Sequence, residues 1–162
     1  MKKVKLLPFE IQMASDVANR RFIENIKMNR TFGAGYKGSN EKTLALGIMG
    51  CCGEIAYCKG QNVFFNGSYS DEHKQYKDTD IAGGIEIRTQ QRKTTNKLII
   101  RPNDKKAKYV LVIDEGNWEY TIQGFYPYII DIDSKYLTNF GISSRPYCYG
   151  IPLQDLYPIE DI

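Results

Sequence analysis

The chain has 162 residues and a net charge of +3, with 42% hydrophobic and 25% charged residues. These values are ordinary for a soluble globular protein, and the length allows a substantial hydrophobic core in one domain spanning residues 1–162. No stretch is apolar for long enough to span a membrane, and the basic N-terminus lacks the apolar run of a secretory signal, so we expect a cytoplasmic protein without a membrane partner.

Two helices are predicted in the N-terminal part of the chain. After a short extended lead that ends at Pro8, apolar residues at helical spacing predict a first helix over residues 9–28. A glycine-rich loop separates it from a second helix over residues 41–59, which Ser39 or Asn40 can cap.

Glycines recur every three residues in the second helix, at Gly47, Gly50 and Gly53. Glycine is a poor helix former, so this spacing indicates that the helix closely approaches a neighbouring backbone. Glu54 follows the last of these glycines, and we therefore expect it to lie near the sheet.

The four cysteines are expected to be free thiols, because a reducing compartment disfavours disulfides. A zinc site formed by Cys51, Cys58 and Cys148 is an alternative, but their spacing is not that of zinc ligands.

The rest of the chain is mostly extended. Short apolar and β-branched runs predict strands at residues 63–65, 85–89, 98–101, 109–113 and 118–125. The run at 109–113 is continuously apolar and is expected to form the central strand, buried on both faces. Short helical turns are expected within 128–137 and 153–156, in a tail that packs back over the sheet. The order of elements predicts an α+β domain with a central mixed β-sheet flanked by helices.

The most informative stretch runs from Asp80 to Thr89. Its last five residues alternate apolar and polar side chains, which predicts a strand with Glu86 and Arg88 on one face. Asp80 precedes Glu86 by six residues, across a Gly83-Gly84 pair that permits a sharp bend. Two acids arranged in this way can converge on one hard divalent cation such as Mg²⁺.

Other polar residues precede this stretch. Asp78 is an alternative to Asp80 as the metal-binding acid, although Asp80 leads directly into the glycine pair. His73 is either a general base or an exposed loop residue.

The Asp80 stretch resembles the motif of the PD-(D/E)XK nuclease superfamily, in which an Asp and a spacer precede Asp/Glu-x-Lys on a strand. The order of short motifs over roughly residues 45–130 is also similar to that of small phage-type proteins in which Arg ends the motif. Besides the Asp80 stretch, these motifs are Gly50-Cys51-Cys52-Gly53-Glu54, Leu98-Ile99-Ile100-Arg101, Tyr109-Val110-Leu111-Val112 and Ile122-Gln123-Gly124-Phe125. The resemblance implies a restriction-endonuclease-like core and metal-dependent hydrolysis of phosphodiester bonds, with DNA preferred over RNA.

The resemblance also assigns catalytic roles to four residues. Asp80 and Glu86 match the acids that bind Mg²⁺ or Mn²⁺, and Glu54 matches a helix glutamate that holds a metal-bound water or a second ion. Arg88 stands where the family usually has Lys. Because a guanidinium stays protonated, Arg88 is expected to bind phosphate and stabilise charge rather than to abstract a proton.

A basic segment follows the motif strand. Residues 88–108 contain eight basic residues and one acid, Asp104, for a net charge of +7, which leaves −4 for the rest of the chain. Candidate contacts with a nucleic-acid backbone are Arg92, Lys93, Lys97 and Arg101. A solvated hairpin whose lysines confer solubility is the alternative.

Two other interpretations of the motif are open. Because Arg88 replaces Lys, the chain could be a catalytically attenuated member of the fold that binds nucleic acid or a protein partner. Alternatively, Glu86 and Arg88 form a cross-strand ion-pair surface on a structural protein.

Overall fold

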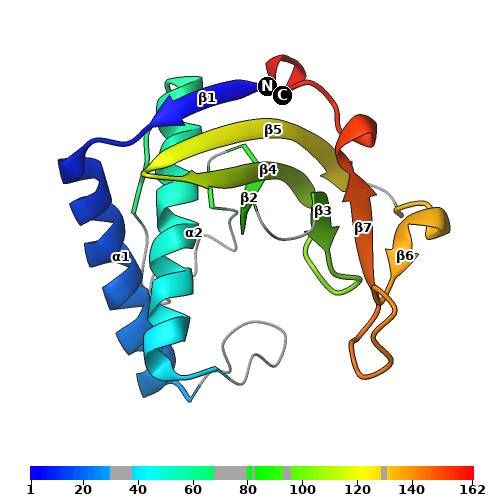
Figure 1. The fold of residues 1–162 in the computed structure, drawn as a ribbon, viewed down its shortest axis with the longest axis horizontal. Helices are drawn as coiled ribbons and strands as arrows, with labels where there is room; N and C mark the ends of the chain where they lie inside the picture. Colours follow the sequence, from blue (N-terminus) through cyan, green and yellow to red (C-terminus); the bar gives the residue numbers. More distant parts are fainter. Residues whose placement is uncertain (30–37, 68–79, 82, 93–95, 129–130) are drawn as a thin grey trace.

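The computed structural model describes residues 1–29, 38–67, 80–81, 83–92, 96–128 and 131–162. Within these residues the structure is α+β, with two α-helices, a four-stranded mixed sheet and a three-stranded sheet (Figure 1). None of the helices in the described part of the chain is long and apolar enough to cross a membrane.

The two predicted helices are confirmed. Helix α1 spans Pro8–Lys27 and helix α2 spans Asn40–Gln61. Ser39 caps α2, because its hydroxyl oxygen accepts a hydrogen bond from the backbone N–H of Lys42.

The main sheet has the strand order β1-β5-β4-β2. Its strands are β1 (Lys2–Lys5), β5 (Glu119–Tyr128), β4 (Ala107–Gly116) and β2 (Ile85–Gln91). Strand β2 runs parallel to β4, whereas β4 and β1 are antiparallel to β5. The motif strand is therefore confirmed, and within the described sheet it is an edge strand.

The second sheet is antiparallel and contains β3 (Lys97–Ile100), β7 (Cys148–Pro152) and β6 (Leu137–Thr138). Short 3-10 helices occur at Ser134–Tyr136, Leu153–Asp155 and Ile159–Asp161, so both predicted helical turns are present. Because β7 pairs with β3, the tail packs back as predicted.

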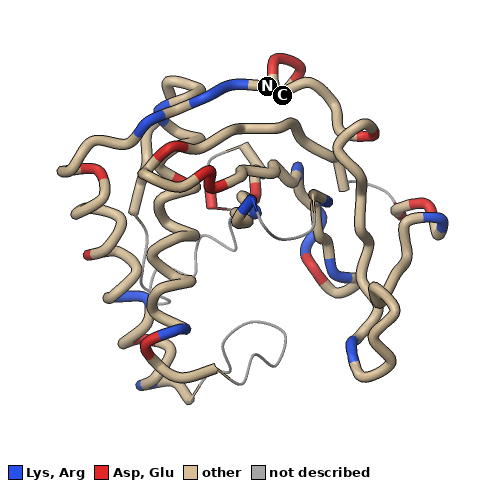
Figure 2. The backbone as a smooth tube through the Cα atoms, in the orientation of Figure 1, with Lys and Arg blue, Asp and Glu red and all other residues tan. Residues whose placement is uncertain are grey.

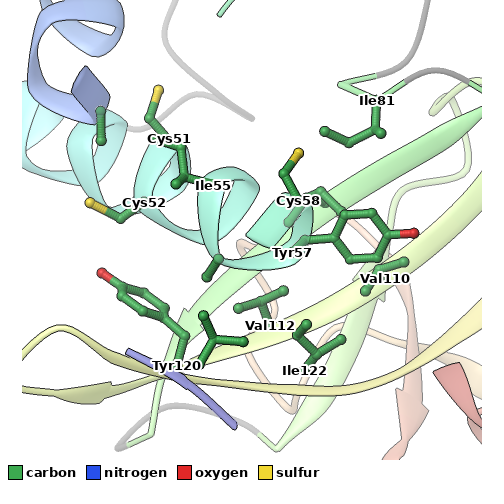
Figure 3. Packing of buried hydrophobic residues seen from close by; sticks show 14 of the residues in the cluster. Cys51, Cys52, Ile55, Tyr57, Cys58, Ile81, Val110, Val112, Tyr120 and Ile122 are labelled. Carbon is green, nitrogen blue, oxygen red and sulfur yellow. The ribbon is translucent and has the colours of Figure 1, made fainter. Parts of the chain in front are cut away.

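Strand β4 is buried on both faces, as its sequence predicts. Val110 and Val112 contact the apolar face of α2, where Ile55 and the neighbouring cysteines lie (Figure 3). The alternate residues Tyr109, Leu111 and Ile113 face a second cluster formed with β3 and β7. The helices therefore cover one face of the main sheet and the small sheet covers the other, rather than helices on both.

Two strand predictions need correction, and the extended lead predicted before Pro8 proves to be a paired strand. The lead before Pro8 contains β1, which pairs with β5. Residues 63–65 form no strand, and the side chain of Phe64 is 85% exposed. Strand β5 does not end near Gly124 but continues through Pro127 to Tyr128. A proline is tolerated there because it lies beyond the last partners on the side of β5 facing away from β4, where β1 pairs as far as Ile122 and Tyr157 bridges Phe125.

Helix α2 approaches β2 closely at Gly53, but there it meets the side chain of Thr89 rather than the neighbouring backbone that the glycine spacing predicts. A Cβ added to Gly53 would overlap Oγ1 of Thr89 on β2 and lie 2.8 Å from its Cγ2. A Cβ added to Gly50 would meet nothing within 4 Å. Gly53 therefore determines how closely α2 and the residue after it, Glu54, approach β2.

This difference predicts opposite effects for two alanine substitutions in one helix. Gly53→Ala should destabilise the protein by about 1–3 kcal/mol, because the methyl group overpacks against Thr89. Gly50→Ala should be neutral or stabilising by up to about 1 kcal/mol, because alanine is the better helix former. Urea unfolding of both variants tests this, and equal effects of the two substitutions would contradict the close approach.

Candidate active site

Glu54 is buried between the two helices and the main sheet. Its carboxylate accepts two hydrogen bonds from Arg21 of α1, at 2.7 Å from Nη1 and 3.0 Å from Nη2. The same Nη1 also contacts Sγ of Cys51, one turn earlier on α2, at 3.3 Å. The sequence suggests that Arg21 lies on the polar side of α1, but its side chain is only 29% exposed and turns toward α2.

The ionisation of this pair reflects its burial. Burial raises the pKa of Glu54 to about 6, although the hydrogen bonds and charge of Arg21 oppose the shift. The carboxylates of Asp80 and Glu86 raise the pKa of Glu54 further. Burial lowers the pKa of Arg21, but Glu54 more than compensates and holds it above its usual value. Arg21 therefore stays charged while Glu54 can exchange a proton near neutral pH.

Glu86 is buried on the opposite face of β2 from α2. Ile87 packs in the helix-facing cluster, so the alternate residues Glu86 and Arg88 point toward the second sheet. Oε1 of Glu86 lies 2.6 Å from Nζ of Lys105, in the turn between β3 and β4. Burial raises the pKa of Glu86, and so does Asp80, whereas Lys105 and Arg88 lower it.

Asp80 lies at the edge of β2 that faces away from β4. Gly83 and Gly84 have φ angles of +86° and +78°, which side chains other than glycine rarely adopt. The resulting turn brings Ile81 into an antiparallel bridge with Ile85. Oδ2 of Asp80 then accepts a hydrogen bond from the backbone N–H of Ile87, at 2.8 Å. The six-residue spacing therefore folds Asp80 back beside Glu86.

The three acids are arranged around the edge of β2 rather than on one of its faces. Glu54 lies on the helix side, Glu86 on the opposite side and Asp80 at the edge between them. They are near enough for Asp80 and Glu86 to shift the pKa of Glu54. Among the residues that the structure describes, no three Asp, Glu, His or Cys side chains form a ready-made metal site. Arg21 and Lys105 instead neutralise two of the acids.

Arg88 is held by two contacts. Its Nη2 donates to Oδ2 of Asp104 at 2.8 Å, and its guanidinium carbon lies 4.9 Å from the centroid of the Tyr109 ring. Oδ2 of Asp104 also accepts the backbone N–H of Arg101, at 2.9 Å. Basic and acidic positions therefore lie together in the turn between β3 and β4 (Figure 2).

Three residues that contact the predicted site residues were not predicted from the sequence, namely Arg21, Asp104 and Lys105. Asp104 has a signal, because it is the one acid in the basic segment. No local pattern couples Arg21 to Glu54, since the two residues are 33 positions apart.

Three of the four residues predicted to contact nucleic acid lie in the described part of the chain, and all three are exposed. Arg92 forms an ion pair with Glu115 at 3.2 Å, Lys97 is the first residue of β3, and Arg101 directly follows its last residue. Lys93 lies outside the described residues, as do Asp78 and His73.

The four cysteines are free, as predicted, and all four are buried. Cys51 and Cys58 lie in the helix-facing cluster, whereas Cys148 is on β7 in the second sheet. The main sheet separates them, so they do not form the alternative zinc site.

An open cavity of about 680 Å³ lies beside β1, β4 and β5, and it is lined by Lys3, Arg92 and Glu119 among others. None of Glu54, Asp80, Glu86 and Arg88 lines this cavity. Its lining mixes both signs of charge.

Comparison of the chain with models of protein families, with curated proteins and with solved structures found no match.

The raised pKa of Glu54 predicts a pH dependence of stability. Its usual value of 4.5 applies to the unfolded chain, whereas the folded value is about 6, so the folded state binds this proton more tightly. The resulting stabilisation is complete below about pH 4.5 and is lost as the pH rises through about 6. It amounts to at most about 2 kcal/mol.

Urea unfolding across this pH range should detect the effect as a difference between the wild type and Glu54→Gln. The amide still accepts a hydrogen bond from Arg21 but does not titrate, so the variant should lack this part of the pH dependence. Parallel stability profiles for the two proteins would show that Glu54 ionises normally.

Proposed function

We propose that the chain is a metal-dependent nuclease of the PD-(D/E)XK type with a restriction-endonuclease-like core, which hydrolyses phosphodiester bonds in DNA. One observation carries the proposal: the Gly83-Gly84 turn folds Asp80 back onto β2 beside Glu86, with Glu54 across the strand edge. Acids of this type and order are the metal-binding residues of the nucleases that the chain resembles.

The acids have the donor chemistry of a site for Mg²⁺ or Mn²⁺. Both ions prefer carboxylate oxygens, and Mg²⁺ usually takes one or two carboxylates from a protein. Oε1 of Glu86 is buried and lies 2.6 Å from Nζ of Lys105, so a metal ion bound there would have to displace this ammonium group. Asp80 and Glu86 would hold the ion, and Glu54 would hold a water beside it.

A divalent ion bound there would supply a water of lowered pKa and neutralise charge on the phosphoryl oxygens. The chain itself supplies the cations for the phosphate. Arg88 has 29% of its side chain exposed, and its guanidinium can donate to phosphate oxygens through N–H groups other than the one that Asp104 binds. Arg21 holds the carboxylate of Glu54 in one orientation.

A second candidate function is a nuclease-fold protein that binds nucleic acid or a protein partner without cleaving it. Arg88 in place of the motif lysine favours this alternative, since arginine cannot act as a base. The internal cations on Glu54 and Glu86 also favour it, because they neutralise the acids without a metal ion. Activity with and without a divalent ion separates the two functions.

The nuclease proposal predicts cleavage of DNA in the presence of Mn²⁺ or Mg²⁺. Asp80→Asn and Glu86→Gln should each lower the cleavage rate on the order of 100-fold or more, because each removes an anionic ligand. Glu160→Gln, at an exposed position in the C-terminal 3-10 helix, should retain the wild-type rate. Circular dichroism and urea unfolding would establish that the variants are folded. Failure of the wild type to cut DNA or RNA with either metal would refute the nuclease.

The proposed contact with DNA predicts binding that weakens steeply with salt. Each basic residue on a phosphate releases counterions, so Arg101→Ala should reduce the slope of log K against log salt by about one. Lys27→Ala, at the far end of α1, should leave the slope unchanged. Fluorescence anisotropy of a labelled duplex measures both, and affinity that is independent of salt would refute the contact.

A further inference from the structure

The turn between β3 and β4 contacts the motif strand through two consecutive residues. Asp104 binds Arg88, and Lys105 lies on Glu86. Because Glu86 and Arg88 are two positions apart on β2, they share one face, and adjacent residues of the turn meet both of them. The turn therefore forms one wall of the candidate site.

Asp104 has two separable contacts. Its Oδ2 accepts the backbone N–H of Arg101, three residues earlier, which stabilises the turn itself. The same oxygen accepts Nη2 of Arg88, at 2.8 Å. The first contact needs only an oxygen acceptor, whereas the second is an ion pair that depends on charge.

The guanidinium of Arg88 is enclosed from two sides. Asp104 holds one end, and the ring of Tyr109 lies under it at 4.9 Å from the guanidinium carbon. The Asp104 side chain is 15% exposed, so its carboxylate is shielded from water on most sides. A long side chain with many rotamers is thereby limited to a small range of orientations beside Glu86.

We propose that Asp104 is a positioning residue, which orients the guanidinium of Arg88 for a phosphate group of the nucleic acid. This proposal rests on the phosphate-binding role proposed above for Arg88. Asp104 touches neither substrate nor metal and acts only through Arg88. The ion pair lowers the entropy that Arg88 loses when phosphate binds.

The proposal makes a prediction opposite to that of simple electrostatics. Removing a negative charge close to a DNA-binding surface should strengthen DNA binding, because phosphate repulsion is reduced. If Asp104 positions Arg88, Asp104→Asn should instead weaken DNA binding, since Arg88 becomes mobile. The amide oxygen still caps the N–H of Arg101, so the turn is retained.

The test is the affinity for a short fluorescein-labelled DNA duplex at low salt in EDTA, measured by anisotropy. Arg88→Ala should weaken binding about tenfold, and Asp104→Asn should weaken it to a similar extent. The double variant should bind no more weakly than Arg88→Ala alone, because Asp104 acts only through Arg88. Asp104→Glu should restore part of the lost affinity.

Asp131→Asn is the matched control. Asp131 also pairs with a cation from the turn, Lys106, but its side chain is 97% exposed. This variant loses the same charge without freeing Arg88, so its affinity should be unchanged or slightly higher. Equal or tighter binding by Asp104→Asn would overturn the proposal, and so would additive losses in the double variant.

Binding in EDTA requires no cleavage, so the outcomes separate the two proposals. The wild type could bind the duplex, and the single and double variants of Arg88 and Asp104 could show the expected affinities, without any cleavage in Mn²⁺. That result would refute the nuclease and leave the role of Asp104 intact. A wild-type chain that does not bind the duplex at low salt would refute the phosphate role of Arg88 and the positioning by Asp104 together.

Discussion

The candidate site depends on the position of β2 at the edge of the main sheet. Alternate side chains of β2 point to opposite faces of the main sheet. Ile87 and Thr89 pack on the helix side, whereas Glu86 and Arg88 face the second sheet. The free edge leaves the backbone N–H of Ile87 without a strand partner, and Asp80 accepts its hydrogen bond. Among the described strands none pairs with this edge of β2 beyond the Ile81–Ile85 bridge, and the hydrogen bond from Ile87 holds Asp80 there.

Burial of acids imposes a second constraint, which is charge balance. An unpaired carboxylate in a protein interior is strongly destabilising, so buried Glu54 and Glu86 require cations. Arg21 and Lys105 come from different layers, the helix pair and the turn before β4. Apolar residues would often stabilise such positions as well as buried ion pairs do. The stability of the fold therefore does not by itself explain why Glu54 and Glu86 are acidic, and this agrees with a functional role.

The sequence predicts those features whose physical cause is local. Helical spacing predicts α1 and α2, and the alternation at 85–89 together with the Gly83-Gly84 pair predicts the strand and its turn. Strand β1 escapes prediction because its four residues include three lysines and gain stability only by pairing with β5. Residues 63–65 have high β propensity but no strand partner, so tertiary context overrides it. The pairs Arg21–Glu54 and Arg88–Asp104 connect distant segments and leave no periodic signal.

The two ion pairs at the strand edge differ in how readily they can open. Arg21 donates two hydrogen bonds to Glu54 and is 29% exposed, so separating this pair costs a bidentate contact in a buried setting. Lys105 is 44% exposed, and its single ammonium group lies 2.6 Å from Glu86. The Glu54–Arg21 pair is therefore the more buried of the two and has two hydrogen bonds, whereas the Glu86–Lys105 pair has a more exposed cation.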